Sequence, residues 1–467
     1  MLGGVGIVMM NIGFISTRFC GTDGVTLETS KWAQVFQRNG YPCFWFAGEL
    51  DRDPSTSYLA PEAHFLSEVN QEINDAVVGS AYRMVETSDL IHAQSQILKR
   101  HLYRFLQKFD IDVVVAENIL SLPMQIPLGL ALTEVIAETQ IPTIAHHHDF
   151  YWERDRYLVN GVGDYLQGSF PPKLNNIAHM VINTAAREEL SRRCGIMAMV
   201  VPNVLDFHHP PKVDMDAARS FRDFIGVKAD DLVVLQPTRV VQRKGIEHAI
   251  NLVHALGRPN AKLVISHQAG DEGFEYAKWL KTFARSLNVD LMFVETHLDD
   301  PWGTYGRSHS RKFPEFSLYD VYPGANFVTY PSLCEGFGNG LLEAIYFKKP
   351  VLVNRYATYV TDIEPLGFDL VSIDGFLTQQ AVERVNQLID SPHLRRQMTG
   401  RNYNIARTHY SYQNLQDQLN GAMTQLLGDN YSRLDADMNQ PAQPEPLTPR
   451  GREPVAEQDM NWARSFN

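Results

Sequence analysis

The sequence predicts an α/β protein of two domains, each built on a parallel sheet with helices on both faces. Short apolar runs alternate with segments of helical spacing in both halves of the chain, the pattern of strand–helix–strand units. The chain has 467 residues, which is too long for one hydrophobic core. A Pro-rich stretch at residues 208–212 divides the halves. We therefore expect a first domain over residues 1–207 and a second over 208–410.

The C-terminal part of the chain divides into a helix and a tail. Leucine and methionine recur at helical spacing within residues 411–428, which indicates a helix with one apolar face. From residue 429 to 467 the sequence is polar and rich in proline, so we expect that tail to be mostly disordered.

Charge and composition exclude several classes of protein. The net charge of −12 argues against a nucleic-acid binder, which needs a basic face for phosphates. Four dispersed cysteines show neither a metal spacing nor a disulfide framework, as expected in the cytoplasm. No apolar run reaches the ~18 residues of a membrane span, and the apolar N-terminus lacks the features of a signal peptide.

The first half opens with a strand, a loop and a helix. We predict a strand over residues 5–10, a loop over 16–25, a helix over 26–37 and a second strand over 41–47. This order is typical of a parallel, doubly wound sheet, in which ligands bind at the carboxyl ends of the strands.

Two later strands of this half end in polar residues. Residues 111–116 form an apolar run that leads into Glu117 and Asn118, and residues 141–145 lead into His146, His147, His148 and Asp149. Adjacent residues on an extended chain face opposite sides, so three consecutive histidines do not suit one metal ion. We read the second loop as a sugar or acceptor pocket, and we discount three scattered Asp-x-Asp triplets as chance matches. We therefore expect no metal site.

The second half contains two motifs that suit an anion. A strand over residues 231–237 is followed by Arg239, Lys244 and a helix from residue 246. Two fixed cations near a helix start would neutralise a diphosphate on an otherwise acidic protein. The plainer alternative is a pair of solvated basic residues at a strand end.

The second motif is a strand over residues 327–330, a turn with three glycines and a helix from residue 341. The N–H groups of a helix start have no partner within the helix, and they attract anions. Glu335 and Glu343 bracket this turn, and Glu343 lies where a carboxylate would accept ribose hydroxyls. The alternative is an ordinary glycine turn with one glutamate in solvent.

The stretch from Glu335 to Glu343 resembles the signature of the retaining nucleotide-sugar glycosyltransferases of family four. This resemblance covers about residues 5–425 and is most specific in the second half. It implies the GT-B fold, with two doubly wound, Rossmann-like domains, an interdomain cleft and a last helix that crosses back to the first domain. The nucleotide sugar would bind to the second domain and the acceptor to the first.

The resemblance also implies roles for individual residues. Glu343 would bind the ribose, and Arg239, Lys244 and the helix start would bind the diphosphate. The donor-binding set is Gly24, Arg239, Lys244, Glu335, Phe337, Gly338, Asn339, Gly340 and Glu343. The catalytic set is His148, Glu335, Arg239 and Lys244, and acceptor contacts fall to Asp23, Asn118, His147 and Asp149.

Two register questions stay open at this point. His148 is the first choice for the histidine that faces the sugar, and His147 is the second. The loop at residues 22–25 is similar to the family's glycine-rich first loop, but Asp23 stands where a second glycine is common, so Gly24 is the safer assignment.

The expected reaction is transfer of a hexose from a GDP- or UDP-hexose to a small soluble acceptor, with retention of anomeric configuration. The chain is loosely similar to synthases of mannosyl- and glucosyl-glycerate type. We expect no tightly bound cofactor, no metal in the chemistry, no nucleic-acid partner and no stable membrane insertion. The alternatives are a nucleotide-sugar epimerase or hydrolase on the same fold and a non-catalytic sugar-nucleotide sensor.

Overall fold

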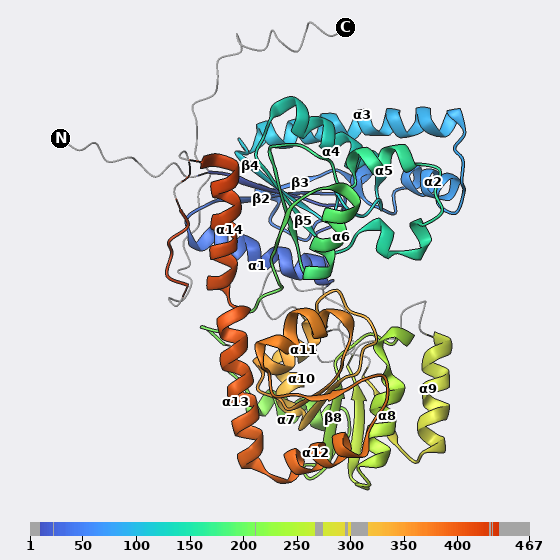
Figure 1. Cartoon of the computed structure of the whole chain (residues 1–467), viewed down its shortest axis with the longest axis vertical. Helices are drawn as coiled ribbons and strands as arrows, with labels where there is room; N and C mark the ends of the chain where they lie inside the picture. The colour runs from blue at the N-terminus through green and yellow to red at the C-terminus, as the bar shows by residue number, and fades with distance from the viewer. Residues whose placement is uncertain are drawn as a thin grey trace, which may run out of the picture.

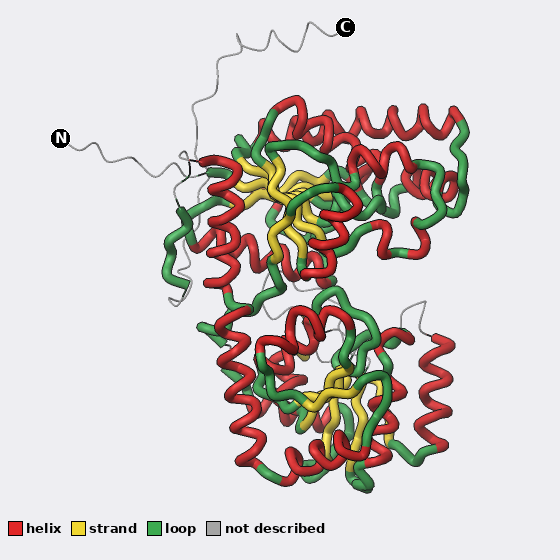
Figure 2. Tube along the Cα trace, in the orientation of Figure 1, coloured by secondary structure: helices red, strands yellow, loops and turns green. Residues whose placement is uncertain are grey.

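The protein consists of two α/β domains, one above the other in Figure 1. The computed structural model describes residues 10–21, 23–210, 212–266, 274–294, 298–299, 316–428, 431 and 433–438. In each domain the strands lie at the centre and the helices lie outside them (Figure 2). No helix of the described part is long and apolar enough to cross a membrane.

The sheet of the first domain has seven parallel strands in the order β3-β2-β1-β4-β5-β6-β7. Chain order reverses between β1 and β4, which makes their carboxyl ends the switch point where doubly wound sheets bind ligands. The strands are β1 (Ile12–Ile15), β2 (Cys43–Ala47), β3 (Ser57–Leu59), β4 (Val113–Glu117), β5 (Thr143–His147), β6 (Ile177–Val181) and β7 (Ala198–Val200).

Helices cover both faces of this sheet. Side chains of α1 (Gly24–Arg38) and α14 (Tyr412–Leu427) share one core with β1, β2 and β4. Side chains of α3 (Val85–Lys108) and α4 (Ile126–Thr139) share a second core on the other face. The domain is completed by α2 (Glu68–Val77), α5 (Gly163–Ser169) and α6 (Thr184–Cys194).

The sheet of the second domain has six parallel strands in the order β10-β9-β8-β13-β14-β15. They are β8 (Leu232–Gln236), β9 (Ala261–Ile265), β10 (Asp290–Phe293), β13 (Phe327–Tyr330), β14 (Val351–Asn354) and β15 (Val371–Ile373), and β11 (Leu298–Asp299) pairs separately with β12 (Phe316–Ser317). The helices are α7 (Met215–Phe224), α8 (Ile246–Ala255), α9 (Phe274–Ser286), α10 (Leu318–Gly324), α11 (Asn339–Tyr346), α12 (Gln379–Asp390) and α13 (Pro392–His409). The fold is therefore α/β with two doubly wound domains, as the sequence predicts.

The chain passes between the domains twice, and the two passages lie side by side. Leu205 on the first passage pairs with Ser411 on the second, and the Leu205 N–H donates to the Tyr410 carbonyl. After the second passage α14 packs on α1 and β6 of the first domain, whereas α13 packs on α11 and α12 of the second (Figure 1).

Most predicted boundaries lie within two residues of the observed ones, and three places differ more. The first described strand is Ile12–Ile15, whereas residues 5–9 of the predicted strand lie outside the described residues. The apolar run at residues 180–184 predicts a strand that starts at Met180, but β6 begins three residues earlier, at Ile177, because Ile177 and Ala178 continue the apolar run. In the predicted tail, Leu434 and Met438 are buried against α14 and its neighbours; residues 439–467 lie outside the described residues.

Candidate active site

The carboxyl ends of the two sheets face one another, and the site is built from the loops that follow these ends. The Asn183 side chain after β6 donates to the Gly336 carbonyl after β13 at 2.7 Å. A Cβ added at Gly336 would lie 3.1 Å from Ile182 and 3.9 Å from the His148 carbonyl oxygen. The glycine turn of the second domain thus contacts two strand ends of the first.

The turn before α11 is held in a conformation that only glycine adopts easily. Gly338 is the N-cap of α11 with φ of 118°, and a Cβ there would lie 2.3 Å from the Tyr356 hydroxyl oxygen. That hydroxyl donates to the Phe337 carbonyl at 2.8 Å. Gly340 is equally restricted, since a Cβ would lie 2.8 Å from the Tyr330 ring. This packing leaves the first N–H groups of α11 at the domain junction.

The two helix starts of the site approach each other. Gly24 is the first residue of α1, and Asn339 is the first residue of α11. A Cβ at Gly24 would lie 3.8 Å from the side-chain amide nitrogen (Nδ2) of Asn339. Asn203 donates to the Asn339 side chain at 2.6 Å across the same junction. Both helices point their N-termini, with partial positive charge, into this region. Such an arrangement is suited to a ligand with more than one negative charge.

Lys244 and Glu335 form an ion pair beside the glycine turn. The Lys244 ammonium lies 2.5 Å from a Glu335 carboxylate oxygen, and both side chains are about nine-tenths buried. Burial lowers the pKa of Lys244, and the neighbouring Glu335 opposes that effect. The positive charges of Arg243 and Arg239 also lower the pKa of Lys244, so the three cations are close together. Arg239 itself is exposed.

Glu343 lies on α11 and accepts a hydrogen bond from the Tyr322 hydroxyl at 2.8 Å. Burial raises the pKa of Glu343, while Tyr322 and the positive charge of Lys31 counteract the rise. Lys31 belongs to α1 of the first domain and is itself paired with Glu28 at 2.7 Å. The sequence predicts Glu343, but its neighbours Tyr322 and Lys31 have no motif that would mark them.

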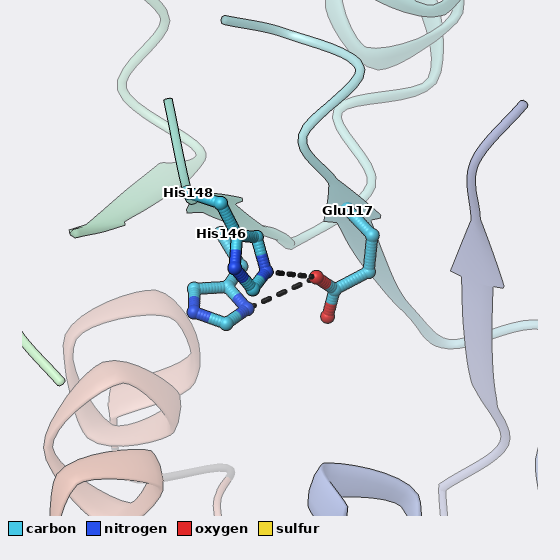
Figure 3. Close-up of side chains that lie close together, drawn as sticks. All are labelled: Glu117, His146 and His148. Atoms are coloured by element: carbon cyan, nitrogen blue, oxygen red, sulfur yellow. Dashed lines mark hydrogen bonds and ion pairs between the residues drawn. The ribbon is translucent and has the colours of Figure 1, made fainter. Parts of the chain in front are cut away.

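At the end of β5 the side chains of His146 and His148 lie together beside Glu117, as Figure 3 shows, whereas His147 lies on the other side of the strand. One Glu117 carboxylate oxygen lies 3.0 Å from His146 Nδ1 and 3.3 Å from His148 Nε2. His147 faces the opposite way and pairs with buried His179 at 2.9 Å. The alternation of side chains along the strand end explains the separation. The structure thus places His148 beside Glu117 and turns His147 into the core.

Burial and pairing act in opposite directions on these groups. Burial alone lowers the pKa of His148, but the hydrogen bond and charge of Glu117 outweigh it, so the pKa of His148 is raised. Burial raises the pKa of Glu117 less than His146 and His148 lower it, so Glu117 remains ionised. The pKa of His147 is well below its ordinary value, chiefly through burial. The pKa values of the two histidines are therefore shifted in opposite directions, which favours the charged form at His148 and the neutral form at His147.

The ligand-type atoms of Glu117, His146 and His148 lie within 4.8 Å of one another, a spacing that a metal ion also uses. One Glu117 oxygen bonds both imidazoles, whereas the other Glu117 oxygen and His146 Nε2 are buried without a hydrogen-bond partner among the described residues. Trp32 stacks on His146 at a ring-centroid distance of 4.1 Å.

The remaining predicted residues of the first domain have structural partners. Asp23 caps α1 by accepting from the N–H groups of Val25 and Thr26. The Asn118 side chain accepts from the N–H groups of His148 and Asp149 and so holds the histidine loop. Asp149 pairs with Arg154 at 2.7 Å.

Beside these residues is a cavity of about 100 Å³ at the switch point of the first sheet. It is lined by Ser16, Thr17, Arg18, Asp23, Val25, Phe65, Glu117, Asn118, Ile119, Leu122 and Met124. Glu117 and Asn118 were expected at a ligand-binding strand end. Phe65 and Leu122 come from segments with no sequence signal, and only the fold brings them here.

Comparison with known proteins finds relatives that match most of the chain. The chain is 33% identical to a mannosylglucosylglycerate synthase of Petrotoga mobilis over 405 residues, which cover 81% of this chain and 90% of the relative. It is 30% identical to a mannosylglucosylglycerate synthase of Thermotoga maritima over 442 residues, 88% of this chain and 99% of the relative. No protein-family model matches the chain.

Solved structures support the fold. HepE of Anabaena, crystallised with UDP-glucose, superposes with a TM-score of 0.58 at 12% identity, covering 89% of this chain and 99% of HepE. At this identity the likeness concerns the GT-B fold alone.

Proposed function

Since the chain belongs to the glycosyltransferase family of the mannosylglucosylglycerate synthases, we propose that it transfers a hexose from a GDP- or UDP-hexose to a small soluble acceptor with retention of anomeric configuration. The observation that carries this proposal is the junction of two helix N-termini beside Lys244, Glu335 and Arg239. This arrangement concentrates positive charge where the diphosphate of a nucleotide sugar would lie.

The donor would be bound mainly by the second domain. Glu343, oriented by Tyr322, would accept hydrogen bonds from the ribose hydroxyls. Arg239, Lys244 and the N–H groups of α11 would stabilise the diphosphate as it becomes the leaving group. Glu335 and the Phe337–Gly338 backbone would hold the sugar hydroxyls, and Gly24 would let α1 approach the phosphates.

The acceptor hydroxyl would attack the anomeric carbon on the face from which the diphosphate departs. A phosphate oxygen of the leaving group would take the proton of that hydroxyl, so the reaction needs no protein nucleophile. His148, charged through Glu117, would donate a hydrogen bond to the transferred sugar. Metal ions have no step in this scheme, and activity in the presence of EDTA tests that point.

The names of the two relatives suggest the substrates. A mannosylglucosylglycerate synthase makes a product in which mannose is attached to glucosylglycerate. We propose the corresponding reaction for this chain, with a mannosyl donor and a glucosylglycerate-type acceptor.

The testing experiment is a transfer assay with GDP-mannose, UDP-glucose and glucosylglycerate, in which product is followed by mass and its anomeric proton by NMR. We expect a disaccharide-glycerate product with the donor's anomeric configuration. Release of free hexose without transfer, or donor binding without turnover, would contradict the proposal.

Variants of two expected donor-binding residues test the proposed donor site. Arg239→Ala and Glu343→Ala should each weaken nucleotide binding about 10- to 100-fold, the effect of losing a hydrogen bond to a charged group. The thermal shift produced by the matching nucleotide diphosphate should shrink accordingly. Arg384→Ala is the control, because that arginine forms a surface pair with Asp369 in the same domain. Equal shifts in all three variants would contradict the assigned site.

A further inference from the structure

The cavity at the switch point of the first sheet lies next to the proposed site of transfer. Glu117, which holds His148, is one of its walls, and Asp23, the cap of α1, is another. Its volume of about 100 Å³ is well above the roughly 10–15 Å³ that one water molecule needs on the same measure. A small polar group such as a three-carbon acid fits this space.

The charged side chains that line this cavity differ in how far their hydrogen-bonding groups are used within the protein. Asp23 accepts from two backbone N–H groups and from the Thr26 hydroxyl, and Glu117 bonds two histidines. Among the described residues that line the cavity, Arg18 is the one lysine or arginine. Asp23 and one Glu117 oxygen are therefore engaged by the protein, whereas the other Glu117 oxygen has no hydrogen-bond partner in the described part of the chain and could accept from a ligand hydroxyl. Arg18 is the cation that lines the space.

Arg18 retains donors for a ligand. Its Nη2 lies 3.2 Å from an Asp23 oxygen, and its guanidinium lies over the Phe65 ring, 5.4 Å from the ring centroid. A guanidinium carries five N–H donors in a planar fork that matches a carboxylate with two parallel hydrogen bonds. Asp23 and Phe65 fix the plane of the fork, which lowers the entropy lost when a carboxylate binds.

We propose that Arg18 binds the carboxylate of the acceptor and selects three-carbon acids, of the glycerate type, over neutral polyols. This inference rests on the proposed function. It assigns the acid end of the acceptor to the cavity and the sugar end to the His148 side. Ser16, Thr17 and Asn118 line the same space and offer polar groups to the hydroxyls of the acid.

The test compares two acceptors of nearly the same shape, glucosylglycerate and neutral glucosylglycerol. For the wild-type chain we expect kcat/KM to be at least tenfold higher with the acid. Arg18→Gln should lower kcat/KM for the acid about 10- to 100-fold, mainly through KM, and change the value for glucosylglycerol less than threefold. Arg18→Lys should retain part of the preference, because it keeps the charge and loses the fork.

Controls separate this role from folding and from the donor site. Arg192→Gln, in an exposed helical pair, should leave both acceptors unaffected. Melting temperature and nucleotide binding of Arg18→Gln should match the wild type, because Asp23 keeps its bonds to α1. If the wild type does not use glucosylglycerol at all, the test is the activity of Arg18→Gln with the acid. Loss of that activity in a variant that folds and binds nucleotide supports the inference, and retained activity overturns it.

The inference is overturned if the wild type shows no preference for the acid, or if Arg18→Gln affects both acceptors equally or neither. The proposed function itself fails in a different way, namely if the wild type transfers to no acceptor from any nucleotide sugar. The two failures are therefore distinguishable in one set of assays.

Discussion

At the scale of single residues, the contact between Glu117 and His148 favours the charged form of the His148 imidazole. Both side chains are buried; Glu117 favours the ionised form of His148, and His146 and His148 together favour the ionised form of Glu117. A raised histidine pKa and a lowered glutamate pKa mean that this pair stabilises the fold fully between the ordinary values of 4.5 for the glutamate and 6.5 for the histidine. The stabilisation is lost as pH rises through the raised pKa.

Glu117→Gln should convert this pair into a neutral one. Burial then dominates, so the pKa of His148 should fall below its ordinary value and the imidazole should be neutral at pH 7. If charged His148 assists transfer, kcat at pH 7 should fall roughly tenfold and recover partly near pH 6. The pH profile of kcat is the measurement.

An unchanged pH profile in Glu117→Gln would contradict the role of that charge. His179→Gln is a useful comparison, because it alters the neighbouring buried pair with His147 and leaves the Glu117 contact intact. An equal loss of activity in both variants would indicate general damage to the loop.

The sequence predicts those residues whose role depends on local backbone. Glu335, Gly338, Gly340 and Glu343 lie within one short segment, so local spacing brings them to one turn and the helix after it, whereas Lys244 comes from a separate segment and meets Glu335 through the fold. Which of His147 and His148 faces Glu117 depends on where β5 ends. The proposed role of Arg18 depends on its position beside Phe65 and Glu117, which are distant in sequence. Such relations arise from the tertiary fold.

At the scale of elements, the start of α11 depends on a glycine that no other residue replaces easily. Gly338→Ala adds two costs: a φ of 118° that side chains rarely adopt, and a Cβ 2.3 Å from the Tyr356 oxygen. We expect a loss of about 1–3 kcal/mol from the backbone alone, and weaker nucleotide binding because the helix start moves. Thermal unfolding with and without nucleotide measures both effects.

Gly375→Ala is the matched control for this prediction. Gly375 also has a positive φ, of 75°, but a Cβ there meets no atom within 4 Å. It should lower the melting temperature less than Gly338→Ala and leave nucleotide binding unchanged. Equal effects on nucleotide binding in the two variants would show that the tight packing of the turn is unimportant.

Strands of parallel sheets were predictable because both faces are buried and the sequence is then continuously apolar. Their ends were less predictable, as β6 shows, because the apolar run spans strand and loop alike. Two apolar runs also adjoin at the start of the chain, and the first strand of the described residues is Ile12–Ile15 in the second run.

At the scale of the whole molecule, the C-terminal part of the chain joins the two domains. Helix α14 contributes Tyr412, Leu415, Leu419 and Met423 to the core of the first domain. Near the passage between domains, Arg38 of α1 pairs with Asp206 at 2.6 Å and lies over the Tyr412 ring, 5.1 Å from the centroid. The first domain is therefore completed by residues that follow the second.

The segment after α14 should add measurable stability to the first domain. Leu434 is 3% exposed and Met438 fully buried, and the Asn420 side chain bonds both the N–H and the carbonyl of Leu434. Burial of two such side chains contributes a few kcal/mol. A chain that ends at Met438 should melt several degrees above one that ends at Gly428, and both should bind the nucleotide equally, since the proposed donor site lies in the other domain. Equal melting temperatures would show that the segment is not part of the core.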